Sequence, residues 1–188
     1  MNMKTIMDWI REIDLVSKKF EETFSDFTQE EMNFKPGKKV WSIAQNIEHI
    51  ILLNSSYFEY FEEIHNRNHS LPKIEDLDTK AQESVIALKP FTGRQRLKRT
   101  NTWDIWQPKK GFIDRNILRD FEESQLQFKN HIKGFEDLLL SETFIRYPGH
   151  LDLLFKLDDC IEFLIEHENR HWNQVVEIGR HSSTSNGS

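Results

Sequence analysis

The stretch SIAQNIEHIILLNSSYFEYFEEI, residues 42–64, predicts a long amphipathic helix and with it the class of fold. Ser42 is a typical helix N-cap, because its side-chain oxygen can accept a hydrogen bond from a backbone N–H of the first turn. After Ser42, apolar residues recur every three or four positions and form one stripe: Ile43, Ile47, Ile50, Ile51, Tyr57, Phe58, Phe61 and Ile64. The stripe lasts about six turns at 3.6 residues per turn, so this helix is long.

Three further segments carry the same apolar spacing, and the strand signals between them are weak. They are residues 5–24, residues 114–140 with a weak last turn at Gly134, and a segment that follows an N-cap at Asp158 or Asp159 and stops at Gly179. Glycine is common directly after a helix because it has no Cβ to hinder the closing turn. Four amphipathic helices of this length predict an all-α fold, a four-helix bundle.

The connection between the second and third helices is long. It spans residues 66–111 and contains three prolines, Pro72, Pro90 and Pro108, so it cannot form a single helix. Residues 78–88 within it can form a short one. A connection of this length lets the third helix lie parallel to the second, or caps one end of the bundle.

The composition indicates one soluble domain. We expect residues 1–180 to form it and the polar residues 181–188, HSSTSNGS, to be a disordered tail. The lone Cys160 excludes an intramolecular disulfide and a cysteine-rich zinc cluster, and agrees with a reducing cytoplasm. The N-terminus lacks the apolar core of a signal peptide, and no apolar run is long enough to span a membrane.

The charge of the chain argues against nucleic acid and anionic membranes as partners. The formal net charge is -6, whereas such partners attract a basic face. One short stretch, RQRLKR at residues 94–99, is basic and lies near Trp103 and Trp106. It is too short to outweigh the acidic chain, and we expect no nucleic-acid binding.

Two pairs of histidines have the spacing of a metal site. They lie in HENRHWNQ, residues 167–174, and in HNRNH, residues 65–69. Histidines four apart on a helix share one face, with Cβ atoms about 5–6 Å apart. The second pair lies where a helix is ending before Pro72, so we interpret it as a solvated helix end. The first pair lies in mid-helix, where the spacing enforces a shared face.

A third ligand must come from another helix, and His49 in WSIAQNIEHI is the candidate. It lies on the shoulder of the apolar stripe, about two turns after the Ser42 cap. A histidine at such a boundary can equally be one whose hydrogen bonds are satisfied within the protein. Gln174 and Gln45, each one turn from a histidine, are candidates to orient a ligand or a bound water, or are plain helix-flank residues.

The motifs PGKKVWS, WSIAQNIEHI and HENRHWNQ together resemble the DinB-like family, whose signature combines a tryptophan-serine helix opening with H-x-x-x-H-x-x-Q in the fourth helix. The resemblance covers most of the chain and implies a bundle of up-down-down-up topology. It also implies a divalent metal ion held by His49, His167 and His171. Relatives often form homodimers, which makes a homodimer an expectation here too.

Three neutral imidazoles leave the full charge of a divalent cation uncompensated and leave coordination positions open, which is typical of a catalytic site. Zinc or nickel suits such ligands first, with iron, cobalt or manganese as alternatives. The resemblance favours transfer of a low-molecular-weight thiol of the bacillithiol type to an electrophilic small molecule. The alternatives are hydrolysis by a metal-activated hydroxide and a noncatalytic bundle that binds metal or a protein partner.

Several other residues are candidates for supporting roles at this site. Glu168 falls in the apolar stripe of the fourth helix, where an unpaired carboxylate is costly. Either it pairs with an arginine or a ligand histidine, or the helix is rotated so that Glu168 leaves the stripe. Trp103 and Trp106 can wall the site, pack in the core or form a dimer contact. The basic residues Arg94, Arg96, Lys98 and Arg99 can receive an anionic thiol or form a solvated loop. No residue is assigned as a catalytic base.

Overall fold

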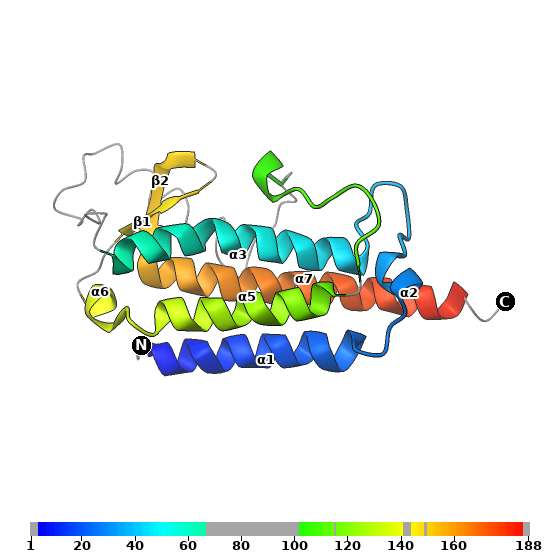
Figure 1. Ribbon diagram of the computed structural model, residues 1–188, viewed down its shortest axis with the longest axis horizontal. Helices are drawn as coiled ribbons and strands as arrows, with labels where there is room; N and C mark the ends of the chain where they lie inside the picture. The colour runs from blue at the N-terminus through cyan, green and yellow to red at the C-terminus, as the bar shows by residue number, and fades with distance from the viewer. Residues whose placement is uncertain (1–3, 67–101, 115, 141–143, 149, 186–188) are drawn as a thin grey trace.

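The computed structural model describes residues 4–66, 102–114, 116–140, 144–148 and 150–185. Four long helices run through it: α1 (Ile6–Phe24), α3 (Ile43–His65), α5 (Ile117–Ile132) and α7 (Leu157–Ser185). Helices α1 and α3 each pack against both α5 and α7, so α1 lies diagonally across the bundle from α3. In Figure 1, α1 and α7 run in one direction and α3 and α5 in the other. The all-α, up-down-down-up four-helix bundle is confirmed.

Side-chain caps define where the helices of the N-terminal half begin. Ser42 accepts a hydrogen bond from the backbone N–H of Gln45, and the Gln45 side chain accepts one in return from the backbone N–H of Ser42. Thr5 and Asp8 make the same reciprocal pair at α1. These boxes satisfy two N–H groups that the helix itself leaves without partners. A short helix, α2 (Gln29–Asn33), follows α1.

The ends of the third and fourth predicted helices were wrong. The third ends at Ile132, and a separate short helix, α6 (Glu136–Leu140), follows. Gly134 lies at this break and packs closely against the His65 ring. A Cβ at this position would lie 2.7 Å from Cε1 of His65. The glycine therefore marks a close approach of two helix ends.

The fourth helix begins at Leu157, so Asp158 and Asp159 lie in its first turn instead of capping it. It does not stop at Gly179 but continues to Ser185, which places the first residues of the expected polar tail in helix. Gly179 contacts a neighbouring ring: a Cβ would lie 3.3 Å from Cζ of Phe27. Its small size admits that ring against α7, which explains a glycine inside a helix.

A β-hairpin that the apolar spacing did not reveal connects α6 to α7. Strands β1 (Phe144–Tyr147) and β2 (His150–Lys156) pair antiparallel, with an irregularity between Arg146 and Tyr147. The strands are short, and the apolar spacing that indicates helices gives no signal for them. In Figure 1 the hairpin lies beside the end of α3.

Only the last part of the long connection is described. It contains the 3₁₀-helix η2 (Asp104–Trp106), which packs on α3. The short helix expected at residues 78–88 and the basic residues 94–99 lie outside the described residues. Among the helices of the described chain, none is both long and apolar enough to cross a membrane.

Candidate metal centre

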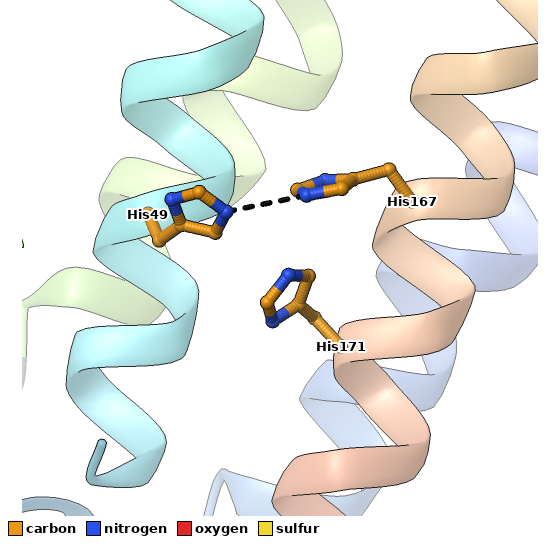
Figure 2. A group of neighbouring side chains, drawn as sticks. All are labelled: His49, His167 and His171. Carbon is orange, nitrogen blue, oxygen red and sulfur yellow. Dashed lines mark hydrogen bonds between the residues drawn. The ribbon is translucent and has the colours of Figure 1, made fainter. Parts of the chain in front are cut away.

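Three buried histidines converge between α3 and α7. His49 comes from α3, and His167 and His171 come from successive turns of α7; their side chains point toward one another in Figure 2. They are 3%, 4% and 5% exposed, respectively. One ring nitrogen from each lies within 4.8 Å of those of the other two. The structure thus brings together the three residues that the sequence suggested as ligands.

The backbone of η2 orients His49. Nδ1 of His49 lies 2.7 Å from the carbonyl oxygen of Trp106, which can only accept. Nδ1 therefore carries the proton, and the lone pair of the neutral ring is on Nε2. Nε2 is the atom that faces the other two histidines, so this hydrogen bond leaves a lone pair directed into the cluster, as a metal ligand would require.

Asn46 orients His171 in a similar way. Its Oδ1 lies 2.8 Å from Nδ1 of His171, and its Nδ2 donates to the carbonyl oxygen of Ser42 at 2.8 Å. The bond to Ser42 fixes which end of the amide faces the imidazole. His171 consequently donates from Nδ1 and keeps its lone pair on Nε2. Both hydrogen bonds of Asn46 are buried, which makes the arrangement rigid.

The contact between His49 and His167 fits two ligands of one ion. Their Nε2 atoms lie 3.2 Å apart (Figure 2). Two nitrogens at zinc–nitrogen distances of about 2.0–2.1 Å and a tetrahedral angle lie about 3.3 Å apart. Without a cation, this contact requires His167 to donate from Nε2, because His49 has its proton on Nδ1. With a cation between them, both atoms can present lone pairs.

The surroundings keep His49 neutral. Burial lowers the pKa of His49 to about 4, and the charge of Arg170 lowers it too, whereas the hydrogen bond to Trp106 acts in the opposite direction. A neutral imidazole is the form that binds a metal ion. At neutral pH the ring therefore need not lose a proton before binding.

One tryptophan ring packs against the histidines, and two further tryptophans pack on the hairpin. The Trp41 ring lies 4.9 Å from the His49 ring and 6.4 Å from the His171 ring, centroid to centroid. Trp106 is buried; its indole N–H donates to Ser56 and its ring packs against Tyr147 of the hairpin. Trp103 also packs on Tyr147 but is 45% exposed. Trp41 thus contacts the site with its ring, and Trp106 contacts it with its carbonyl oxygen.

Glu168 lies between the helices and has polar partners. It is 0% exposed, and its Oε1 accepts hydrogen bonds from Asn54 of α3 at 2.6 Å and from Gln125 of α5 at 2.8 Å. Burial raises the pKa of Glu168 to about 7, although both hydrogen bonds lower it. The partners are amides, neither an arginine nor a histidine. This side chain links α7 to α3 and α5 directly beside the three clustered histidines.

Gln45 and Gln174, the two candidates for orienting a ligand, lie in other surroundings. Gln45 completes the Ser42 cap and donates to the carbonyl oxygen of Lys109 at 2.6 Å. Gln174 is exposed on α7. The orienting roles belong to Asn46 and to the Trp106 carbonyl, which the sequence analysis missed. Asn46 was detectable, because it precedes His49 by three residues and so shares its helix face.

The second histidine pair is not brought into a comparable cluster. His65 is the last residue of α3, as the sequence predicted for a helix end, and it is exposed. Its Nε2 bonds to the carbonyl oxygen of His131 at 2.7 Å, and its ring stacks on Phe135 with centroids 4.7 Å apart. His69 lies outside the described residues.

Comparisons with known proteins agree with this architecture. The family model of the DinB superfamily matches residues 12–175. A solved structure from Bacillus subtilis, YfiT, is described as a probable metal-dependent hydrolase with an unusual four-helix bundle topology. It matches with a TM-score of 0.61 and 14% sequence identity over 96% of this chain and 89% of that chain, a likeness that shows the fold. No curated protein matches the chain significantly.

Proposed function

The chain belongs to the DinB superfamily, and from that membership and the geometry of its histidines we propose that it is a divalent-metal-dependent enzyme. The proposed ligands are His49, His167 and His171. The observation that carries the proposal is the convergence of three buried imidazoles, one ring nitrogen of each lying within 4.8 Å of those of the other two. Two of them are already held with Nε2 toward the centre, by Trp106 and by Asn46.

Such a site fits the chemistry of nucleophile activation. A divalent cation held by three neutral imidazoles keeps its charge, and supplies Lewis acidity that lowers the pKa of a thiol or of water. The chain contributes the orientation of the ligands and their burial from bulk water, with the Trp41 ring packed against two of the imidazoles. Zinc and nickel are the ions that we propose first, because imidazole suits both.

The nucleophile that we propose is a low-molecular-weight thiol, transferred to an electrophilic small molecule. Among the described residues, the cluster of ligand-type atoms contains no carboxylate that can act as a base. Glu168 is bonded to two amides, and Glu48 accepts from the backbone N–H of Lys109. A thiol, with a pKa of about 8.5, needs less assistance than water, with a pKa of about 15.7.

The thiol must come from solution in this proposal. The only cysteine of the chain, Cys160, is 0% exposed in the core. Burial raises the pKa of its thiol well above the usual value. A buried, protonated thiol is a poor nucleophile, so Cys160 does not supply the reacting sulfur.

Hydrolysis is the second candidate, favoured by the description of YfiT as a probable metal-dependent hydrolase. In that case water, in place of the thiol, would be the nucleophile at the same site. The observation that ranks hydrolysis below thiol transfer is that the carboxylates adjacent in sequence to the histidines already accept hydrogen bonds, Glu48 from the Lys109 backbone and Glu168 from two amides.

A two-stage assay separates these proposals. The protein is stripped with a chelator, titrated with zinc and nickel, and given monochlorobimane with and without a low-molecular-weight thiol. We expect stoichiometric binding of one of the two ions and consumption of the electrophile only when both thiol and metal are present. His65→Ala serves as the matched control for His171→Ala.

Each other outcome points to a different function. Turnover of ester or amide substrates by the metal-loaded protein without thiol would establish hydrolysis instead. Failure to bind any of zinc, nickel, iron, cobalt or manganese stoichiometrically, with normal folding, would leave the noncatalytic bundle.

A further inference from the structure

A hollow of about 410 Å³ adjoins the histidine cluster. Its lining comes from the segment that leads into α3 and from the segment around η2: Lys35, Lys38, Lys39, Val40, Trp41, Gln45, Asp104, Gln107, Pro108 and Lys110. These segments are far apart in sequence and meet only in the folded chain. We call this feature the lysine hollow.

The charge in the lysine hollow is opposite to that of the whole chain. Four lysines line it against a single carboxylate, whereas the chain carries a net charge of -6. Within the part of the chain that the structure describes, none of these four lysines forms an ion pair. Positive side chains around a concave surface concentrate a favourable potential for an anion there.

The wall of the hollow is held firmly to α3. The backbone N–H of Lys109 donates to Oε2 of Glu48 at 2.6 Å, and the Lys109 carbonyl oxygen accepts from Gln45 at 2.6 Å. Gln45 and Glu48 are 2% and 9% exposed, so both anchors are buried. The position of the neighbouring Lys110 backbone is therefore fixed relative to α3 and its histidine.

Trp41 connects the lysine hollow with the histidines. Trp41 lines the hollow, and its ring centroid lies 4.9 Å from the ring centroid of His49 and 6.4 Å from that of His171. A molecule seated in the hollow consequently meets the indole before it meets the imidazoles. Gln45, another lining residue, lies one helical turn before His49.

We propose that the lysine hollow binds the anionic group, a carboxylate or a phosphate, of a small-molecule substrate whose reacting part crosses Trp41 to the histidines. This inference rests on the proposed function for the identity of the reacting end. It adds the substrate class, a small organic anion, and the residues that select it. Ammonium groups suit both anions as hydrogen-bond donors and point charges.

The test is a titration with succinate and, separately, with inorganic phosphate at constant ionic strength, on the stripped protein and on the zinc-loaded protein. The readout is the NMR resonance of the Trp41 indole N–H, assigned with Trp41→Phe. The variant is Lys38→Gln with Lys39→Gln. The control is Lys18→Gln with Lys133→Gln, which removes the same charge from exposed sites elsewhere.

We expect a saturable shift of the Trp41 resonance with at least one anion, and the responding anion distinguishes carboxylate from phosphate substrates. Loss of two lysines should weaken binding about tenfold, the sum of two exposed charge contacts. The control should bind like the parent.

Three results would overturn the inference: no shift with either anion, parent-like binding by the Lys38/Lys39 variant, or equal weakening by the control. Stoichiometric zinc binding accompanied by any of these would remove the lysine hollow but keep the proposed function. Saturable anion binding by a protein that binds no metal would support the lysine hollow as an anion site and would contradict the proposed function.

Discussion

Helix α3 carries a histidine near each end, and the two have opposite roles. At His49 the backbone carbonyl of Trp106 takes Nδ1, which leaves Nε2 to face two further imidazoles. At His65 a backbone carbonyl takes Nε2 itself, and the ring stacks on Phe135 at an exposed helix end. Two features therefore separate a candidate ligand from a packing residue. One is which ring nitrogen is hydrogen-bonded to the backbone, and the other is whether further imidazoles converge on the second nitrogen.

A buried polar layer lies between these two ends of α3. Asn54 follows His49 by five residues and bonds to Glu168 of α7, which also accepts from Gln125 of α5. Beyond it the core is aromatic, with Phe61, Phe128 and Phe135 fully buried. The layer sets the register of α7 against α3, and thus the height of His167 and His171 relative to His49.

The largest contrast is expected between His171→Ala and His65→Ala. Removing His171 deletes a proposed ligand, so the affinity for zinc or nickel should fall by more than about 100-fold. Losing a residue that only hydrogen-bonds to a ligand already costs up to about 100-fold. His65→Ala should bind like the parent, because its ring lies at the other end of α3. Isothermal titration of the stripped proteins measures both. Parent-like binding by His171→Ala would refute the metal site.

The next effect concerns Glu168→Gln and depends on pH. The pKa of Glu168 is raised from 4.5 to about 7 by burial, so the folded protein holds this proton more tightly than the unfolded chain. The stability from the protonated group is full below about pH 4.5 and is lost as the pH rises through about 7, a loss of about 3 kcal/mol. The amide of the Glu168→Gln variant has no proton to lose and avoids this loss.

Urea unfolding of the stripped protein between pH 4.5 and 8 measures this difference. The stability of Glu168→Gln relative to the parent should rise across that range and then level off. Glu177→Gln, on an exposed part of the same helix, should run parallel to the parent. A parent–variant difference that is independent of pH would show that Glu168 does not titrate as described.

A smaller effect is expected for Asn46→Ala, which removes the acceptor of the His171 N–H. Loss of such an orienting partner weakens metal binding by about 10–100-fold. Gln174→Ala, on the exposed face of α7, should leave the affinity unchanged. Thermal unfolding of the stripped variants detects any loss of folding that would imitate an effect on affinity. If Gln174→Ala were the weaker binder of the two, the assignment of Asn46 would be wrong.

The smallest effect is expected at the opposite end, for Gly134→Ala. The added Cβ would lie 2.7 Å from His65 Cε1, but that atom is the end of an exposed side chain that can rotate away. Unfolding free energy should fall by at most about 1 kcal/mol, with unchanged metal affinity. Urea denaturation measures the first quantity and metal titration the second. A large loss of metal affinity would mean that the two ends of α3 are coupled.

Much of the bundle is predictable from local patterns. The Ser42 cap and the stripe after it predicted α3, and the shared face of His167 and His171 follows from helix geometry alone. Two of the errors, at the ends of the third and fourth helices, occurred where a glycine is explained by contacts from distant residues. Gly134 faces His65, and Gly179 faces Phe27, neither of which is visible in the local sequence.

The sequence by itself determined the four helices, the i, i+4 histidine pair and the lone cysteine, because each depends on residues within a few positions. Only the tertiary structure decided that His49 lies 3.2 Å from His167, and that the Trp106 carbonyl selects the tautomer of His49. It also brought Lys110 and Lys38 together in the lining of one hollow. These pairs are far apart in the chain, and only the packing of helices and loops sets the distances between them.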